Sequence, residues 1–304
     1  MSYVTVIGAA VMDISAKSKA PIKPGDSNPG CILRSAGGVG RNIAENLARL
    51  SVDVKLIAAL GDDAAGGKLL DASQAAGIDM AYCVIDRGAA TSTYIAILDA
   101  NGDMNVAVME YSAKLTMEHI QKHRDMIAGS EIILLDANLD PEMNAGILDQ
   151  FPGKAMYIDP ISKTKAEWMK HLVGRFHTMK MNQFEASTLA GFAVTKDRES
   201  LEKAGDYFLK QGLQRAIISL GEGGLYYHTA EEKILRPARP VSIQNATGAG
   251  DAVMAAVIYC SRMGKSADYT VDFAQAMARL TLLSDGAVSS QISIAAVERC
   301  MKGQ

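Results

Sequence analysis

The stretch Asn245-Ala246-Thr247-Gly248-Ala249-Gly250-Asp251 decides how this chain is interpreted, together with the run Ala252-Val253-Met254-Ala255-Ala256-Val257-Ile258 that follows it. Two glycines in three residues allow a tight turn and let a ligand approach the backbone closely. The small apolar residues of the run predict a buried helix. A glycine turn that opens into a helix presents free amide N–H groups and the positive end of the helix dipole. This stretch therefore predicts a binding site for an anion.

The carboxylate of Asp251 makes the prediction more specific, because a carboxylate repels an anion. A turn that only bound phosphate would have no use for it, whereas a site that transfers a phosphoryl group to a hydroxyl needs a group that takes the proton. The alternative is that Asp251 only caps the helix. Two familiar motifs are excluded: the turn lacks the third glycine of a dinucleotide fingerprint, and the stretch 61–69 lacks both a glycine and the Ser or Thr of a P-loop.

The composition is that of a soluble protein and gives no sign of a nucleic-acid or membrane partner. The chain has 304 residues, of which 48% are hydrophobic and 21% charged, which is enough for one large domain or two small ones. A net charge of −3 gives no electrostatic reason to expect nucleic acid or an anionic membrane as a partner. The four scattered cysteines indicate neither a disulfide framework nor a zinc site. Because no basic leader and no apolar run of transmembrane length are present, we expect a cytoplasmic protein.

Hydrophobic patterning predicts an alternation of strands and helices. Strands are predicted at 3–7, 54–60, 91–98, 105–109, 131–137, 155–159, 177–181, 215–220 and 225–228. Helices are predicted to follow Asn42 and near 64–76, 116–128, 141–150, 183–190, 199–211, 250–263, 268–283 and 292–302. This order predicts one α/β domain with a parallel sheet that helices cover on both faces. The pair Asn101-Gly102 between two strand-like runs predicts a hairpin, which we interpret as part of a flap.

A second glycine turn, Gly37-Gly38-Val39-Gly40-Arg41-Asn42, leads into another predicted helix. Asn42 is in its first turn, where its amide can face a ligand; the alternative is that the glycines only allow close helix packing. Asp13 follows the first strand, and we expect it at the end of a loop that leaves this strand. In open α/β sheets such strand ends face the ligand crevice.

Two further motifs follow predicted strands. Asn182 and Glu185 form an Asn-x-x-Glu pair, which suits Mg²⁺ held mostly through water. The alternative is a capping box, with Asn182 as N-cap and Glu185 completing it. The turn Ser219-Leu220-Gly221-Glu222-Gly223-Gly224 is typical either of a nucleotide-phosphate site or of a hairpin.

Together, these motifs resemble the ribokinase (PfkB-type) family of carbohydrate and nucleoside kinases along essentially the whole chain. The two glycine turns correspond to the two family signatures, and the Asn-x-x-Glu pair corresponds to its magnesium motif. The resemblance implies a three-layer α/β/α sandwich with a mostly parallel central sheet over residues 1–304 and a small β lid from roughly 9–35 and 83–112. It also implies a cytoplasmic enzyme that uses ATP and Mg²⁺ to phosphorylate the 5′-hydroxyl of a ribosyl substrate, and a homodimer formed through the lid.

The resemblance also implies roles for particular residues. The general base and the anion hole around it would be Asp251, Gly248, Ala249 and Gly250. The sugar or nucleoside would be bound by Asp13, Asn28, Gly37, Gly38, Asn42 and Asn138. The nucleotide would be contacted by Asn182, Ser219, Gly221, Gly224, Thr247 and Gln275. Mg²⁺ would be held through water by Glu185 and Asn182.

Three positions depart from the family pattern. Val11 stands where relatives usually carry Asn, which leaves the fine substrate preference open. Asn245 replaces the more common Asp, which in many relatives belongs to a loop that holds a monovalent cation, so K⁺ activation is also open. Ser51 stands where relatives often end the helix with Gly. Alternative functions are ribokinase or another nucleoside kinase, and a catalytically silent sugar-sensing protein on the same fold; a fold alone does not separate them.

Overall fold

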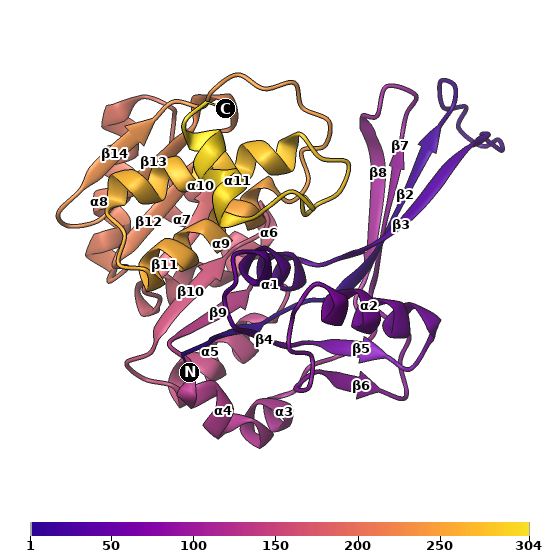
Figure 1. The fold of residues 1–304 in the computed structure, drawn as a ribbon, viewed down its shortest axis with the longest axis horizontal. Helices are drawn as coiled ribbons and strands as arrows, with labels where there is room; N and C mark the ends of the chain where they lie inside the picture. The colour runs from indigo at the N-terminus through magenta and orange to yellow at the C-terminus, as the bar shows by residue number, and fades with distance from the viewer. Residues whose placement is uncertain (1, 304) are drawn as a thin grey trace.

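A large sheet forms the middle layer of the molecule, and helices cover both of its faces (Figure 1). The computed structural model describes residues 2–303 of the chain. Within these residues the large sheet has eight strands, which lie side by side in the order β14 (Lys233–Arg236), β13 (Leu225–His228), β12 (Arg215–Ser219), β11 (Thr178–Asn182), β10 (Ala155–Asp159), β9 (Ile132–Asp136), β1 (Val4–Ile7) and β4 (Val54–Ile57). All neighbours are parallel except at one edge, where β13 is antiparallel to both β12 and β14.

The helices pack on the two faces as separate hydrophobic cores. One core lies under α1 (Val39–Arg49), α9 (Ala249–Arg262), α10 (Ala267–Leu282) and α11 (Ile294–Met301). The other lies under α3 (Met117–Lys122), α4 (Arg124–Gly129), α5 (Pro141–Gln150), α6 (Lys163–Met169), α7 (Gln183–Ala190) and α8 (Arg198–Gln211). In β1, Val6 faces the first core and Ile7 the second, so successive residues of a strand serve opposite layers. Within residues 2–303, no helix combines the length and the apolar character needed to cross a membrane.

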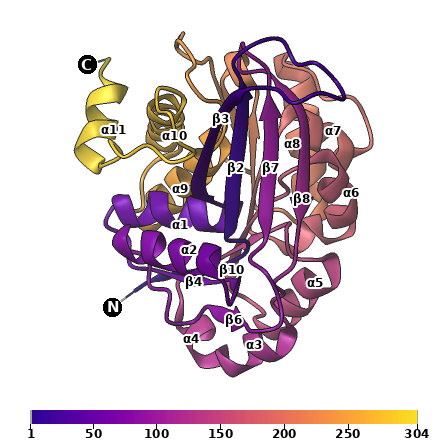
Figure 2. The same ribbon diagram turned by 90° about the vertical axis from the view of Figure 1, so that its right-hand side faces the viewer.

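A second, four-stranded sheet projects from the sandwich as the lid (Figure 1), and Figure 2 shows its four strands side by side. Its strands lie in the order β3 (Gly30–Gly37), β2 (Val11–Ser18), β7 (Thr93–Leu98) and β8 (Met104–Glu110). The predicted hairpin at Asn101-Gly102 joins β7 to β8, and Gly102 has the positive φ of 97° that such a turn requires. The predicted lid segments contain β2, β7 and β8 and most of β3, which extends to Gly37, but β6 (Val84–Asp86) does not belong to the lid. It pairs instead with β5 (Ala59–Gly61) in a separate sheet, next to α2 (Ala64–Ala75).

The fold differs from the sequence prediction in several elements. The helix predicted over 116–128 is divided at His123 into α3 and α4, and the strand predicted over 54–60 is divided into β4 and β5. The edge strand β14 was not predicted, because Lys233–Arg236 is short and polar. Helix α6 and the 3₁₀ helices η1 (Lys170–Arg175) and η2 (Gly221–Gly223) were also not predicted. Ser51 has a φ of 60°, the left-handed conformation in which Gly is unstrained.

Candidate active site

Four neighbouring parallel strands end in polar residues at the same edge of the large sheet. Asp136 ends β9, Asp159 ends β10, Asn182 ends β11 and Ser219 ends β12. The ladder pairs Asp136 with Asp159 and Asn182 with Ser219, and the register of β10 with β11 places the second pair two positions further along the strands. Because the carboxyl ends of parallel strands form the ligand crevice of open α/β sheets, these strand ends mark the candidate site.

The two glycine turns, although far apart in the sequence, meet at this edge. Asn42 in the first turn of α1 donates a hydrogen bond from Nδ2 to Oδ2 of Asp251, at 3.0 Å, and both side chains are buried. Gly248 is the residue before α9 and has a φ of 84°. A Cβ at Gly248 would overlap the carbonyl oxygen of Ala287, so both conformation and space require glycine there. The turn therefore presents its amides beside a carboxylate that the other turn holds in place.

The surroundings of Asp251 raise the pKa of its carboxyl to about 7. Burial is the main cause, because it penalises the charged form, and the nearby carboxylate of Asp159 adds to it. The hydrogen bond from Asn42 and the positive charge of Lys180 act in the opposite direction, and Asp136 raises the pKa further. A carboxyl with a pKa near neutrality is matched to proton transfer at physiological pH.

Lys180, in the middle of β11, is a buried cation that the sequence analysis missed. Its Nζ forms an ion pair with Oδ2 of Asp159 at 3.0 Å, and the two side chains are only 8% and 4% exposed. A Cβ at Gly250 would lie 2.5 Å from this ammonium, so Lys180 lies against the start of α9. Burial lowers the pKa of Lys180, but attraction to Asp159, Glu185 and Asp251 outweighs it and raises the pKa. One Lys in an otherwise uncharged, buried strand was the signal in the sequence.

Asp136 is a second buried group that the sequence analysis did not single out. Its Oδ2 accepts hydrogen bonds from the backbone N–H groups of Ala9 and Gly40, both at 2.8 Å. Its Oδ1 accepts a hydrogen bond from the backbone N–H of Asn138 at 2.9 Å. Burial raises the pKa of this carboxyl. Asp136 therefore fixes three segments around the crevice: the end of β1, the Gly37–Asn42 turn and the start of the β9–α5 loop.

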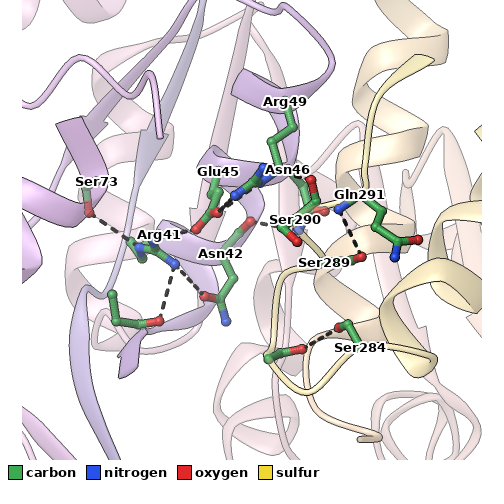
Figure 3. A network of polar contacts seen from close by, with 12 residues as sticks. Arg41, Asn42, Glu45, Asn46, Arg49, Ser73, Ser284, Ser289, Ser290 and Gln291 are labelled. Atoms are coloured by element: carbon green, nitrogen blue, oxygen red, sulfur yellow. Dashed lines mark hydrogen bonds and ion pairs between the residues drawn. The ribbon is translucent and has the colours of Figure 1, made fainter. Parts of the chain in front are cut away.

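A polar network on α1 orients Asn42 (Figure 3). Arg41 donates from Nη1 to Oδ1 of Asn42 at 3.4 Å, and its own charge is paired with Glu45 at 2.5 Å. Because arginine can only donate, this contact assigns the oxygen of the Asn42 amide and turns its N–H groups toward Asp251. Glu45 also binds Arg49, which reaches the carbonyl of Ser290. The network thus connects α1 with the α10–α11 loop.

Asp13 lies inside strand β2, where it pairs with Ser35, and not at the end of a loop as predicted. A Cβ at Gly37 would overlap the carboxylate of Asp13, and a Cβ at Gly38 would overlap the carbonyl of Ala9. The two glycines therefore allow the Asp13 carboxylate and the backbone to approach each other. Burial raises the pKa of Asp13 to about 6, against the attraction of Arg41.

The structure brings Asn138 to the crevice but does not bring Asn28 there. Asn138 is held by Asp136, as described above. Asn28 is exposed in the loop between β2 and β3, and its side chain makes hydrogen bonds only to Lys23 and Asp26 among the described residues. Five ladder positions of β2 separate this end of the lid from Asp13, which corresponds to about 17 Å.

A cavity of about 760 Å³ lies beside the start of α9 and includes several of the residues expected to contact a nucleotide. Its lining includes Ser219, Gly221, Gly224, Gln275, Ala249 and Gly250. Thr247 and Asn182 are not among the lining residues, although Ala246 is. Gln275 donates a hydrogen bond from Nε2 to the carbonyl of Arg236 at 2.6 Å, which joins α10 to β14 across the cavity wall.

Asn182 and Glu185 form the capping box that the sequence analysis gave as the alternative. Oδ1 of Asn182 accepts hydrogen bonds from the N–H groups of Phe184 and Glu185, and a carboxylate oxygen of Glu185 accepts one from the N–H of Asn182. The buried Glu185 has a raised pKa, because burial and the charge of Asp159 outweigh Lys180. Carboxylate and amide oxygens at a strand end are donors that fit Mg²⁺ held through water. The cap leaves one Glu185 oxygen for that role.

Comparisons with known proteins agree with this geometry. The model of the pfkB family of carbohydrate kinases matches residues 1–294. A pseudouridine kinase of Escherichia coli (strain K12) is 36% identical over 97% of this chain and 95% of its own length. A ribokinase of Staphylococcus aureus (strain COL) is 27% identical over 84% of each chain. The crystal structure of a putative sugar kinase from Clostridium perfringens is similar with a TM-score of 0.89 and 34% identity, over 100% of this chain and 96% of that one.

The family match and the site support the same assignment. The family model covers nearly the whole chain, and both glycine turns converge on one buried carboxylate. The chain therefore belongs to the pfkB family of carbohydrate kinases, and it is an ATP-dependent phosphotransferase that acts on the alcohols of sugars or nucleosides.

Proposed function

We propose that this protein transfers the γ-phosphoryl group of ATP to the 5′-hydroxyl of pseudouridine. The observation that carries the proposal is the buried Asp251–Asn42 pair at the start of α9, which places a carboxyl with a pKa of about 7 beside an anion-binding turn. The choice of pseudouridine rests on the relative that is 36% identical. The segments 26–30 and 37–48, and Asn rather than Asp at 245, also favour it.

In this proposal, three residues bind the ribose and a fourth activates its 5′-hydroxyl. Asp13, Gly38 and Asn42 bind the sugar hydroxyls, and Asp251 takes the proton from the 5′-hydroxyl as it attacks the phosphorus. The backbone N–H groups of residues 248–250 stabilise the charge that develops on the phosphoryl group in transfer. An alcohol is a poor nucleophile at neutral pH, so the reaction needs both the base and the stabilisation of charge by the backbone N–H groups.

Lys180 and Mg²⁺ balance the charge of the nucleotide in this proposal. Lys180 lies against Gly250 and supplies a fixed positive charge near the transferring group. Mg²⁺, held through water by Glu185 and Asn182, would neutralise phosphate oxygens when bound. ATP would lie along the cavity beside α9, where Ser219, Gly221, Gly224 and Gln275 are the expected contacts. Thr247, in the turn before α9, and Asn182, at the end of β11, stay proposed contacts outside the cavity lining.

The lid has two roles in the proposal. Its inner face carries Asp13 and would close over the ribose, which excludes water as a competing acceptor. Its other face exposes a row of apolar side chains: Ile32, Ile95, Ile97, Val106 and Val108. An exposed apolar sheet face of this kind is typical of a contact surface, and we propose that it forms a homodimer. Asn138, near Asp136, and Asn28, at the lid tip and away from the crevice in this structure, are the two weaker candidates for contacts with the sugar.

An acceptor panel with ATP tests the substrate. We expect the highest kcat/KM with pseudouridine, and lower values with ribose, uridine, inosine and adenosine. Running the panel with and without K⁺ shows whether Asn245 has removed cation activation. Preference for free ribose would replace the pseudouridine assignment by a ribokinase. Binding without turnover on any acceptor would support a sensing protein and contradict the kinase.

The pKa of Asp251 predicts the pH dependence of catalysis. The base must be deprotonated, so kcat/KM for the acceptor should rise with pH through about 7 and level off above it. The groups that set this value are Asp159 on β10, Lys180 on β11, Asp136 on β9 and Asn42 on α1. A pH–rate profile under saturating MgATP measures it. A flat profile between pH 5.5 and 8.5 would contradict Asp251 as the base.

A further inference from the structure

Three polar side chains from different elements form a cluster at the edge of the crevice. Tyr111 follows lid strand β8, Asn138 follows β9, and Lys165 lies in the first turn of α6. Oδ1 of Asn138 accepts hydrogen bonds from both the Tyr111 hydroxyl, at 2.5 Å, and the Lys165 ammonium. The Lys165 ammonium also lies 2.6 Å from the Tyr111 oxygen and 4.8 Å from the centre of its ring. Neither Tyr111 nor Lys165 has a role in the phosphoryl transfer described above.

The cluster presents only hydrogen-bond donors to a ligand. Lysine has no acceptor, so its contact with Asn138 assigns the oxygen of that amide. The amide nitrogen of Asn138 then carries two N–H donors, of which one interacts with the side chain of Asp136 and the other is left over. The Lys165 ammonium uses two of its three protons within the cluster. The groups left over are therefore N–H donors from Asn138 and Lys165, which match the carbonyl oxygens of a ligand.

Asp136 connects this cluster to the residues proposed to bind the ribose. Its Oδ1 holds the backbone N–H of Asn138, while its Oδ2 holds Gly40 in the turn that also carries Asn42. Its charge acts both on Lys165 and on Asp251. The cluster and the proposed base thus lie around the same buried carboxylate. A group attached to the ribose on the side away from the phosphate donor would meet the cluster.

The backbone just before α6 has a strained conformation, and this segment positions the helical turn that carries Lys165. Ile161 has a φ of 66°, a left-handed conformation that a β-branched residue rarely adopts. Asp159 accepts a hydrogen bond from the N–H of Ile161 at 2.8 Å, and Ser162 caps the helix that carries Lys165. A strained residue of this kind is kept only where the surrounding structure holds it in place, and such residues are most common at functional sites.

The charges in the crevice favour a neutral group on the acceptor over a negatively charged one. Asp159 is paired with Lys180, but the carboxylates Asp13, Asp136 and Asp251 also surround the proposed acceptor site, so a second phosphate dianion on the acceptor would be repelled. A neutral ring with carbonyl oxygens gains the hydrogen bonds without this repulsion. Adenine offers an amino donor and ring nitrogens in place of the carbonyls.

We propose that Tyr111, Asn138 and Lys165 form a subsite that recognises the carbonyl oxygens of a pyrimidine-2,4-dione base carried by the ribose. The proposal rests on the proposed function, because it names the residues that select the nucleoside acceptor over free ribose. Lys165 and Asn138 donate to the base, and Tyr111 holds Lys165 in position. Tyr111 follows lid strand β8, so the subsite joins the lid to the sandwich.

The test compares acceptors in a variant that removes the ammonium and keeps the length of the side chain. In Lys165→Met, we expect the ratio of kcat/KM for pseudouridine to kcat/KM for ribose to fall about tenfold or more, mainly through KM, which is the range expected for one lost charged hydrogen bond. The matched control is Lys163→Met, an exposed residue two positions earlier on the same helix. The control should keep the ratio of the parent enzyme.

Calorimetric titration with pseudouridine, ribose, adenosine and fructose 6-phosphate separates this proposal from the function on which it rests. Weaker pseudouridine binding in Lys165→Met, with the parent Kd retained in Lys163→Met, supports the subsite even if no acceptor is phosphorylated. An unchanged Kd and an unchanged ratio overturn the subsite while leaving the kinase intact. If Lys165→Met loses only the binding of fructose 6-phosphate, the cluster is a phosphate site and the proposed base subsite is wrong. Absence of turnover in the parent enzyme overturns only the proposed function.

Discussion

Replacing Asp251 by Asn is expected to lower kcat by about three or more powers of ten. The carboxylate is the only group in the proposed mechanism that takes the proton of the attacking hydroxyl, and positioned general bases contribute roughly this much. Asn has the same shape, and its oxygen can still accept the hydrogen bond that Asn42 donates. The geometry of the two turns should therefore survive. Acceptor Kd values measured by calorimetry are expected to stay close to those of the parent enzyme.

The same variant should change how stability depends on pH. Burial raises the pKa of Asp251 from its ordinary value near 3.8 to about 7, so the folded protein holds a proton that the unfolded chain releases. This contribution to stability is fully present below about pH 4 and is lost as the pH rises through 7. Asp251→Asn removes this contribution. The free energy of unfolding, measured in urea, should therefore fall less between pH 4 and 7 in the variant than in the parent enzyme. Wild-type turnover in Asp251→Asn would refute the assignment of the base.

The position of Asp251 beside a glycine turn could be predicted, because it depends only on residues that are adjacent in the sequence. A glycine turn before a small-residue helix predicts an anion site from the residues themselves, and the Asp251–Asn42 hydrogen bond shows that the two glycine turns meet. The sandwich was equally predictable, because buried parallel strands give apolar runs that alternate with helical periodicity. The Asn101-Gly102 hairpin was specified by two residues that tolerate a positive φ.

The residues that were missed acquire their roles through tertiary contacts. Lys180 and Asp136 sit in strands whose neighbours are 20 or more positions away in sequence, and nothing local indicates which buried partner compensates each charge. Asp13 was placed in a loop because its β-ladder partner, Ser35, lies across the long connection at 19–29. For Asn182 and Glu185, the sequence could not separate a cap from a metal site, and the capping box shows that the same atoms serve the helix terminus.

Replacing Lys180 by Met is expected to affect both stability and turnover. The ammonium is the partner of Asp159 in a pair that is nearly inaccessible to solvent. Removing one member of a buried pair leaves an uncompensated charge, which typically destabilises a protein by about 3–5 kcal/mol. Lys180 also lies 2.5 Å from the position that a Cβ at Gly250 would occupy, so kcat should fall by about two orders of magnitude as its field on the transferring phosphoryl group is lost. Urea unfolding and steady-state kinetics measure the two effects.

The double variant Lys180→Met with Asp159→Asn separates the structural role of Lys180 from its catalytic role. With both charges removed, no unpaired ion is left in the core, so much of the lost stability should return. The pKa of Asp251 should change little, because the double variant removes one charge that raises it and one that lowers it. Turnover should nevertheless stay low, since no cation then faces the start of α9. Recovery of kcat together with stability would show that Lys180 only balances Asp159, and that the backbone amides and the metal carry the charge of the phosphoryl group.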